Sequence, residues 1–198
     1  MSAVAAIVLA AGRSTRMGAA NKLLCPVDGR PMVVHAVAAA LASRARPVVV
    51  VTGHEAEAVE AVLPPGVTAV RNADHASGIA SSLRCGLTAL PEEVAATVVL
   101  LGDMPRVGAV AIDRLVALFE EAPHVAAVAP TWRGEPANPV LIARRLFAEV
   151  MRLEGDQGAR RLFAGRGDVL TVATDDPAMA IDIDTPEALA ALAARDSA

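Results

Sequence analysis

The chain has 198 residues, of which 54% are hydrophobic and 2% aromatic, and its formal net charge is −4. This composition predicts a single domain, residues 1–198, with an aliphatic core. The acidic balance excludes the class of nucleic-acid-binding proteins, because these need an excess of Lys and Arg on one face.

Short apolar runs rich in valine recur along the chain and predict strands buried on both faces of a parallel sheet. In chain order they are 4–9, 47–52, 67–70, 97–101, 125–129, 140–142 and 169–173. Helical spacing between them predicts helices at 32–41, 55–63, 77–90, 112–121, 144–153, 158–163 and 186–194. The alternation predicts an α/β fold, a doubly wound and mainly parallel sheet.

The segment from about 130 to 165 interrupts this rhythm, since Pro, Gly and Asn cluster at 134–139. We expect it to pass over the sheet as an excursion. No apolar run approaches the roughly 18 residues of a membrane span, and the start of the chain lacks the basic region of a signal peptide. Cys25 and Cys85 lack metal-ligand spacing and suit a reducing compartment. The expected location is the cytoplasm, with no membrane partner.

The loop after the first predicted strand is rich in small and basic residues. It reads LAAGRSTRMGAANK over residues 9–22. Glycine lets backbone N–H groups approach an anion, and arginine offers forked donors to phosphate oxygens. The spacing is neither that of a dinucleotide-binding loop nor that of a Walker loop. An ordinary turn and an anion-binding loop both stay open, and three cations within a short stretch of an acidic protein favour the second.

Carboxylates follow two other predicted extended segments. Asp103 comes directly after a buried run, and an extended backbone would point Asp182 and Asp184 to the same side. Mg²⁺ takes oxygen ligands, commonly one or two protein carboxylates beside substrate phosphates. The alternatives are caps, at Asp103 for a helix or a turn and at Asp184 or Thr185 for the last helix. Because ligands bind outside the carboxyl ends of such strands, the two charge types together predict a site for a nucleoside triphosphate with Mg²⁺ and favour nucleotidyl transfer.

Six segments taken together resemble the nucleotidyltransferase family that contains molybdenum cofactor cytidylyltransferase. They are LAAGRSTRMGxxNKLL (9–24), NxDxxxGxxxSLRxG (72–86), LLGDMP (100–105), NPVLI (138–142), LEGDQGARRL (153–162) and DIDTPEAL (182–189). The resemblance implies a Rossmann-like fold and the transfer of CMP from CTP to the terminal phosphate of molybdopterin, with Mg²⁺ as cofactor. It also implies a recipient molybdoenzyme as a further partner.

The family pattern implies a role for each matching residue. Arg16 and Lys22 would hold the triphosphate, and Asp103 and Asp184 would hold Mg²⁺, so that Arg16, Lys22 and Asp103 form the catalytic set. The implied nucleotide-binding residues are Leu9, Ala10, Ala11, Gly12, Arg13, Ser14, Asn72, Gly78, Ser81 and Ser82. The implied acceptor side comprises Asn138, Pro139, Asp156, Arg160 and Asp182. For Asn138 and Asp156, a turn and a helix start are the structural alternatives.

Several positions bear on the substrates. Ala11 and Asn21 match cytidylyl rather than guanylyl members of the family, which favours CTP over GTP. Ala137 stands where members carry glycine, so other phosphorylated acceptors, such as a sugar phosphate, methylerythritol phosphate or phospholactate, stay open. His75 is expected to be a solvated loop residue. A cofactor-binding chaperone without turnover is the alternative from another class, and the combination of cations and carboxylates favours an enzyme.

Overall fold

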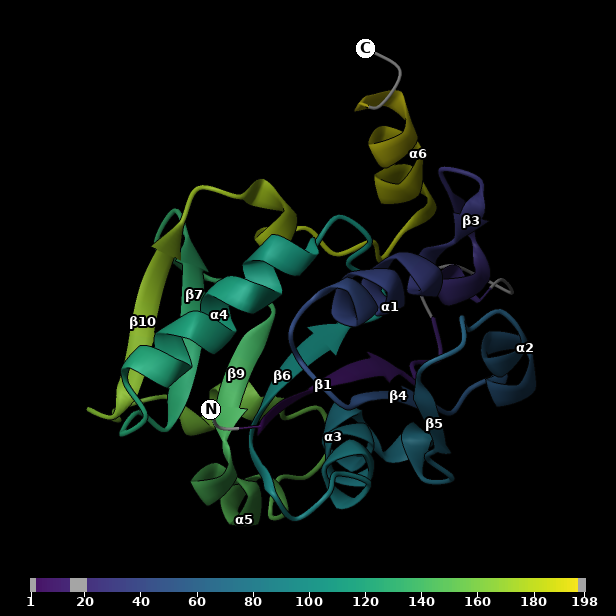
Figure 1. The fold of residues 1–198 in the computed structure, drawn as a ribbon. Helices are drawn as coiled ribbons and strands as arrows, with labels where there is room; N and C mark the ends of the chain where they lie inside the picture. The colour runs from purple at the N-terminus through teal and green to yellow at the C-terminus, as the bar shows by residue number, and fades with distance from the viewer. Residues whose placement is uncertain (1–2, 15–20, 196–198) are drawn as a thin grey trace.

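A mainly parallel sheet runs through the middle of the protein (Figure 1). The computed structural model describes residues 3–14 and 21–195, and within them eight strands form the sheet in the order β10-β7-β9-β6-β1-β4-β5, with β8 paired to β7. The strands are β1 Ala3–Ala10, β4 Val48–Thr52, β5 Thr68–Arg71, β6 Val94–Leu101, β7 Ala127–Trp132, β8 Glu135–Pro136, β9 Val140–Ala143 and β10 Val169–Thr174. The predicted fold class is confirmed, and each predicted strand overlaps an observed one. A separate hairpin pairs β2 Pro26–Val27 with β3 Arg30–Pro31.

Helices and short 3-10 turns connect the strands. The helices are α1 Met32–Ala42, α2 Ala56–Ala61, α3 Ile79–Thr88, α4 Ala109–Glu121, α5 Phe147–Val150 and α6 Pro186–Arg195. The 3-10 turns are η2 Lys22–Leu24, η3 His75–Ser77, η4 Arg144–Leu146, η5 Ala159–Leu162 and η6 Pro177–Ala180. The helix predicted from residue 77 begins at Ile79, because Gly78 has a φ of 109° that no helix accommodates. The helix predicted at 158–163 is the 3-10 turn η5.

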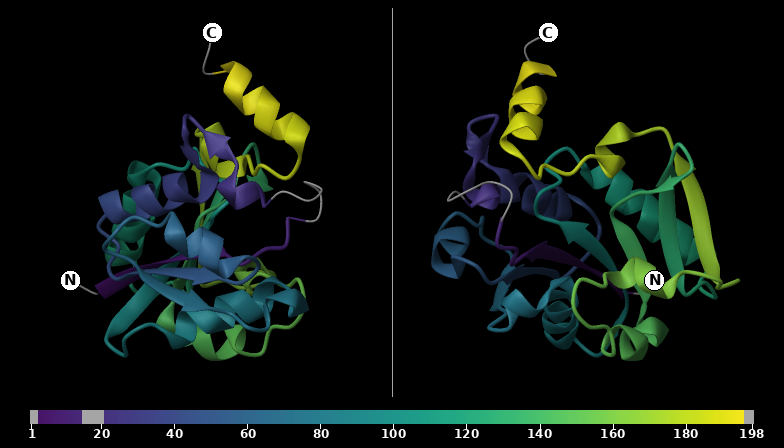
Figure 2. Two further views of the ribbon diagram at one scale, coloured as in Figure 1. Left: turned by 90° about the vertical axis from the view of Figure 1, so that its right-hand side faces the viewer. Right: turned by 180° about the vertical axis from the view of Figure 1, so that it is seen from behind.

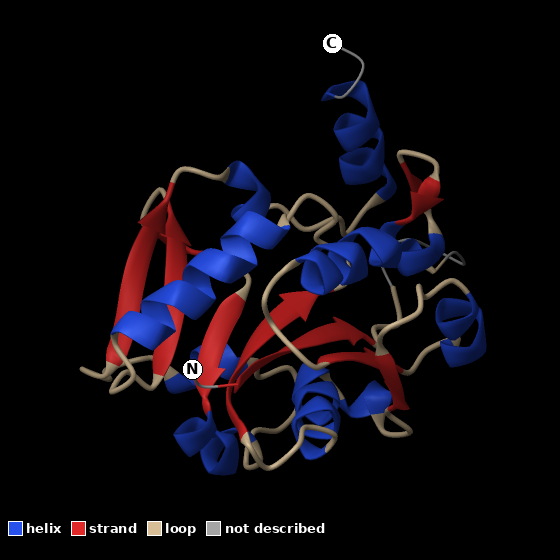
Figure 3. Cartoon of the chain, viewed as in Figure 1, coloured by secondary structure: helices blue, strands red, loops and turns tan. Residues whose placement is uncertain are grey.

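Helices cover both faces of the sheet, with α1 and α4 on one face and α3 and α5 on the other (Figure 3). Strand β1 shows why both faces of the sheet must be covered. Its residues Val4, Ala6 and Val8 pack into the core beneath α1 and α4, whereas Ala5 and Ile7 pack with α3 and α5. A strand that is apolar on both faces can lie only in the middle of such a layered sheet.

Residues 130–165 do not pass over the sheet as predicted. β9 lies inside the sheet, antiparallel to both neighbours, and Leu141 pairs with Val98 of β6 and Val128 of β7. The reason is that the whole of β9 is apolar and buried, so it stabilises the protein most as a central strand. The Gly and Pro residues at 134–136 instead form the β7–β8 hairpin, where Gly134 has a φ of 85°. The segment that leaves the sheet begins at η4.

Helix α6 projects from the body beside the β2–β3 hairpin (Figure 2). Leu192 of α6 and Ile183 before it pack against Val27 and Met32. Thr185 Oγ1 accepts a hydrogen bond from the backbone N–H of Ala188 at 3.2 Å, so the predicted helix cap is confirmed. None of the described helices is both long enough and apolar enough to cross a membrane.

Candidate active site

A pocket of about 780 Å³ opens at the carboxyl edge of the sheet, where β1 and β6 end. Most of the predicted site residues line it, namely Leu9, Ala11, Gly12, Arg13, Ser14, Lys22, Gly78, Ser82, Asp103, Asp156, Asp182 and Asp184. They come from segments far apart in the sequence, which the topology of the sheet brings to one edge. Asp182 and Asp184 share this pocket while Ile183 between them is buried, so the predicted alternation is confirmed.

Arg16 falls outside the described residues. Among the described residues, the predicted Ala10 is not part of the lining and is buried in the core. The side-chain amide of Asn72 donates to the hydroxyl oxygens of Ser81 at 2.8 Å and Ser82 at 3.0 Å, and all three residues are buried. Asn72 and Ser81 therefore stand behind the wall and fix Ser82, which reaches the pocket.

The predicted acceptor residues divide in the same way. Asp156 and Asp182 line the pocket, whereas Asn138, Pro139 and Arg160 do not. The backbone N–H of Asn138 donates to the carbonyl of Met179 at 2.7 Å, and the Arg160 guanidinium donates to the carbonyl of Pro136 at 3.3 Å. Burial lowers the pKa of Arg160, and the charge of Asp182 acts against this. Arg160 thus lies within electrostatic reach of the pocket rim.

The structure also shows the surroundings of Ala137, which stands where family members carry glycine. It is buried, its backbone N–H donates to the carbonyl of Pro130 at 2.9 Å, and its φ is not in the left-handed region. An alanine therefore fits this position without backbone strain.

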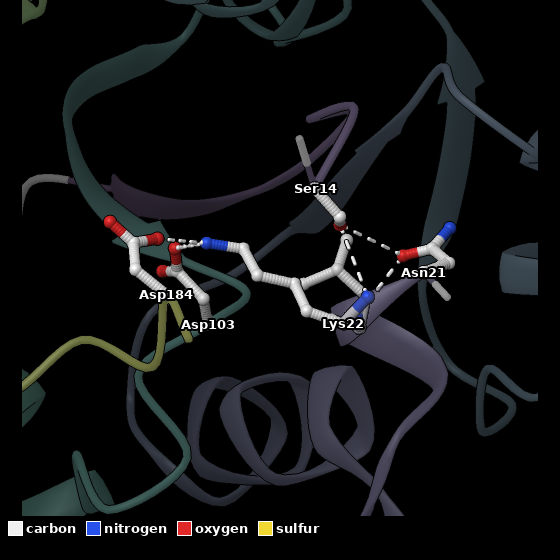
Figure 4. Close-up of polar contacts among 6 residues, drawn as sticks. Ser14, Asn21, Lys22, Asp103 and Asp184 are labelled. Atoms are coloured by element: carbon white, nitrogen blue, oxygen red, sulfur yellow. Dashed lines mark hydrogen bonds and ion pairs between the residues drawn. The ribbon is translucent and has the colours of Figure 1, made fainter. Parts of the chain in front are cut away.

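Three charged side chains meet at the floor of the pocket (Figure 4). The Nζ atom of Lys22 lies 2.6 Å from Asp103 Oδ2 and 2.5 Å from Asp184 Oδ1. The side chains of Lys22, Asp103 and Asp184 keep only 13%, 17% and 32% of their exposure. The backbone N–H of Ile183 donates to the carbonyl of Asp103 at 3.0 Å and so joins the two carboxylate segments. This is a partly buried and charge-assisted cluster.

The backbone that carries Lys22 is fixed by the loop after β1. Ser14, in the left-handed region with a φ of 52°, accepts a hydrogen bond at its Oγ from the Lys22 N–H at 3.1 Å. Asn21 Oδ1 accepts from the Leu23 N–H at 3.1 Å and caps η2. Figure 4 shows both side chains beside the lysine. The loop therefore sets the position from which Lys22 reaches the carboxylates.

Burial and charge shift the pKa values of this cluster. Burial lowers the pKa of Lys22, but the charges and hydrogen bonds of Asp103 and Asp184 outweigh it, so the pKa lies above its ordinary value of 10.5. Burial raises the pKa of Asp103, with the ammonium group of Lys22 opposing and Asp182 and Asp184 adding to the rise. The cluster therefore favours the charged form of Lys22. The burial of Asp103 disfavours its charged form, and the ammonium group of Lys22 offsets part of this effect.

Raising the pH above 10.5 is expected to destabilise the protein through Lys22. Because its pKa is raised in the folded state, its ion pairs contribute their full stabilisation below pH 10.5, and this is lost as the pH rises through the higher folded pKa. The sequence has no other lysine and no tyrosine, so few other groups titrate there. Urea unfolding between pH 9 and about 12 should show a steeper fall for wild type than for Lys22→Met. Parallel profiles would contradict the assignment.

The residues present fit a divalent cation. Asp103 Oδ1 is buried and, among the described residues, has no hydrogen-bond partner. A buried carboxylate oxygen without a donor is costly, and a cation is the partner that such an atom suits. Asp103 and Asp184 would supply two protein ligands, and no group of three or more His, Cys, Asp or Glu forms a metal cluster in the described part of the chain. Two carboxylates suit a Mg²⁺ ion that takes its other ligands from substrate and water.

The part of the pocket wall that includes Gly78 and Asp156 depends on a close backbone approach. Gly78 has a φ of 109°, and a Cβ atom there would lie 2.3 Å from the carbonyl carbon and oxygen of Gly155. The Ala80 N–H donates to that carbonyl at 3.1 Å, and the Arg84 guanidinium donates to the carbonyl of Leu153. These contacts hold residues 153–156 against the start of α3. They bring Asp156 to the pocket.

Sequence reasoning missed some of the lining. Leu23, Ala76, Ile79 and Leu101 contribute apolar surface. His75 was expected in solvent, but it is half-buried in the pocket wall, with Nδ1 3.2 Å from the carbonyl of Asn72. Its place between two motif residues, Asn72 and Gly78, was the available signal.

Comparison with known proteins finds a matching family model, related sequences and similar structures. Residues 6–193 match the model of the MobA-like NTP transferase domain. A relative named bifunctional protein GlmU, from Syntrophotalea carbinolica, is 35% identical over 155 residues, which are 78% of this chain and 32% of the relative. This chain therefore spans about a third of the length of such curated relatives.

Solved structures cover the chain more fully. Rv0371c from Mycobacterium tuberculosis H37Rv superimposes with a TM-score of 0.86 at 27% identity, covering 98% of this chain and 100% of that one. A complex of Rv0371C with manganese superimposes with a TM-score of 0.80 at 26% identity, covering 97% of this chain and 98% of that one. The fold described above is thus found in a protein whose structure in complex with manganese is known.

Proposed function

Since the chain belongs to the MobA-like NTP transferase domain family and is a nucleotidyltransferase, we propose that it transfers CMP from CTP to the terminal phosphate of molybdopterin and releases pyrophosphate. The observation that carries the proposal is the meeting of Lys22 with Asp103 and Asp184 at the floor of one pocket. Cations suit a triphosphate, and paired carboxylates suit its metal. We further propose that this chemistry takes place in the cytoplasm and that the product passes to a recipient molybdoenzyme.

The reaction needs no nucleophile from the protein. An oxygen of the acceptor phosphate attacks the α-phosphorus of CTP, and the bond from that phosphorus to the β-phosphate oxygen breaks as pyrophosphate leaves. The acceptor oxygen is already anionic, so catalysis is a matter of in-line positioning and charge neutralisation. Lys22 would stabilise the leaving pyrophosphate, together with Arg16.

A divalent cation, Mg²⁺ by this proposal, would be held by Asp103 and Asp184, and it would supply polarisation of the α-phosphate. The buried Oδ1 of Asp103 supports this assignment, and so does the manganese complex of the related Rv0371C. Arg13, Ser14 and Ser82 line the same pocket and would contact the phosphates and the nucleoside. Asp156 and Asp182 would face the acceptor.

Support for CTP comes from the first loop, where Ala11 and Asn21 match the cytidylyl pattern. A second candidate acceptor, a sugar phosphate, is favoured by the 35% identity to the protein named GlmU. The two candidates share the nucleotide side of the pocket and differ on the acceptor side.

A pyrophosphate-release assay tests the proposal. We expect release with CTP and molybdopterin in the presence of Mg²⁺, and little with ATP, GTP or UTP. Each nucleotide is tested with molybdopterin, with a sugar phosphate and without acceptor. If GTP is the one nucleotide that gives release, the assignment of CTP is overturned. If the sugar phosphate is the one acceptor that gives release, it replaces molybdopterin as the proposed acceptor. Tight binding of molybdopterin without release would support a chaperone instead of an enzyme.

A further inference from the structure

Lys22 is the only lysine in the sequence, and all other residues counted as Lys or Arg are arginines. Its ammonium group lies between the two carboxylates that suit the cation, at 2.6 Å from Asp103 and 2.5 Å from Asp184. In Figure 4 the lysine side chain points away from Ser14 and Asn21 and toward both carboxylates. Lys22, which is expected to bind the triphosphate, is thus paired with Asp103 and Asp184, which are expected to bind the metal.

One ammonium group and one divalent cation cannot share these two carboxylates at low cost. Both need the same carboxylate groups, and like charges at a few ångströms repel strongly in a partly buried site. Lysine suits an exchange of partners, because its ammonium group is a compact point charge on a flexible four-carbon stem. The backbone of Lys22 is held by Ser14 Oγ, so the exchange requires movement of the side chain alone.

We propose that Lys22 is an internal competitor of the divalent cation for Asp103 and Asp184, so that it turns to the triphosphate only when the cation takes the carboxylates. Lys22 then links two binding events. Metal binding releases the ammonium group for the phosphates, and phosphates that capture the ammonium group free the carboxylates for metal. Such coupling is reciprocal by thermodynamic necessity. The triphosphate part rests on the proposed function, and the competition itself does not.

Mn²⁺ binding without nucleotide, followed by electron paramagnetic resonance of the free ion, tests the competition. We expect Lys22→Met to bind Mn²⁺ about tenfold more tightly than wild type, because the internal competitor is gone. Lys22→Arg keeps a cation that can pair with both carboxylates and is expected to stay near wild type. Circular dichroism and the melting temperature of each variant show that it is folded.

Arg13→Met is the matched control for general electrostatics. Arg13 lines the same pocket, whereas the ion pairs of Asp103 and Asp184 found among the described residues are with Lys22. Removing its charge is expected to change Mn²⁺ affinity by about twofold at most, because the charge is exposed and screened. An equal gain in Arg13→Met and Lys22→Met would overturn the proposal, and so would a Lys22→Met variant that binds Mn²⁺ no better than wild type.

The single lysine allows a direct view of the exchange. In protein labelled with ¹³Cε-lysine, one NMR signal reports Lys22. We expect this signal to move when Mg²⁺ saturates the protein and to move again on addition of CTP. A signal that stays unchanged at saturating Mg²⁺ would overturn the proposal. The Mg²⁺ step needs neither CTP nor molybdopterin, so a failed transfer assay with a moving signal refutes the proposed function and leaves the competition supported.

Discussion

Asp103→Asn is expected to lower kcat/KM for pyrophosphate release by about a thousandfold, which corresponds to roughly 4 kcal/mol of transition-state stabilisation. The side chain keeps its size but loses the charge that would hold the cation, and its Oδ1 position is a buried atom that has no hydrogen-bond partner among the described residues. Steady-state kinetics with saturating Mg²⁺ measure the loss. The same assay over a range of Mg²⁺ concentrations separates a lost metal from a lost contact to substrate.

The fold should survive this change. Lys22 keeps its ion pair with Asp184, and the backbone hydrogen bond from Ile183 to the Asp103 carbonyl does not involve the side chain. Asp182→Asn is the matched control, since it removes the same charge from the same pocket, and it is expected to cause a much smaller loss. Wild-type turnover with unchanged Mg²⁺ dependence in Asp103→Asn would refute the metal assignment.

Gly78→Ala is expected to lower the free energy of unfolding by about 2–4 kcal/mol. A Cβ atom at this position would lie 2.3 Å from the backbone of Gly155, and a φ of 109° disfavours any L side chain. Relief requires residues 153–156 to move from α3, which also displaces Asp156 from the pocket. Urea denaturation followed by circular dichroism measures the change.

Gly108→Ala serves as the control for this substitution. Gly108 precedes α4 with a φ of −94°, and a Cβ atom there would have no heavy atom within 4 Å. Its free energy of unfolding should stay within about 1 kcal/mol of wild type. If both alanine variants unfold at the same urea concentration as wild type, the close approach of Gly78 to Gly155 does not contribute to stability.

The sequence predicts those strands and helix caps that are determined by neighbouring residues in the chain. Runs such as Val48–Val51 are apolar on both faces and short, and these properties alone specify a buried strand of a layered sheet. The cap at Thr185 follows from its position before a proline that opens a helix. The joint pocket was also predictable, because Asp103 and the first loop both follow strands that end at one edge.

Features that depend on contacts between distant parts of the chain could not be predicted in this way. Whether the apolar residues 140–143 lie at an edge or in the centre depends on which strands leave a place open, and no local pattern encodes this. The direction of the Lys22 side chain was equally hidden, since it depends on two carboxylates that lie far along the sequence. His75 was predicted in solvent because its place between two motif residues does not by itself say whether the side chain faces solvent or the pocket wall.

The position of β9 has a consequence for how the chain folds. β6 and β7 follow one another in sequence, yet among the described strands they are joined in the sheet only through β9. The half-sheet β5-β4-β1-β6 is complete by Leu101, whereas β7 and β10 join it only when residues 140–143 enter the place between them. Such a late, long-range closure is kinetically slow. These four residues thus couple the half-sheet β5-β4-β1-β6, whose strands β1 and β6 end at the pocket, to strands β7 and β10, and cooperative unfolding of the whole sheet passes through them.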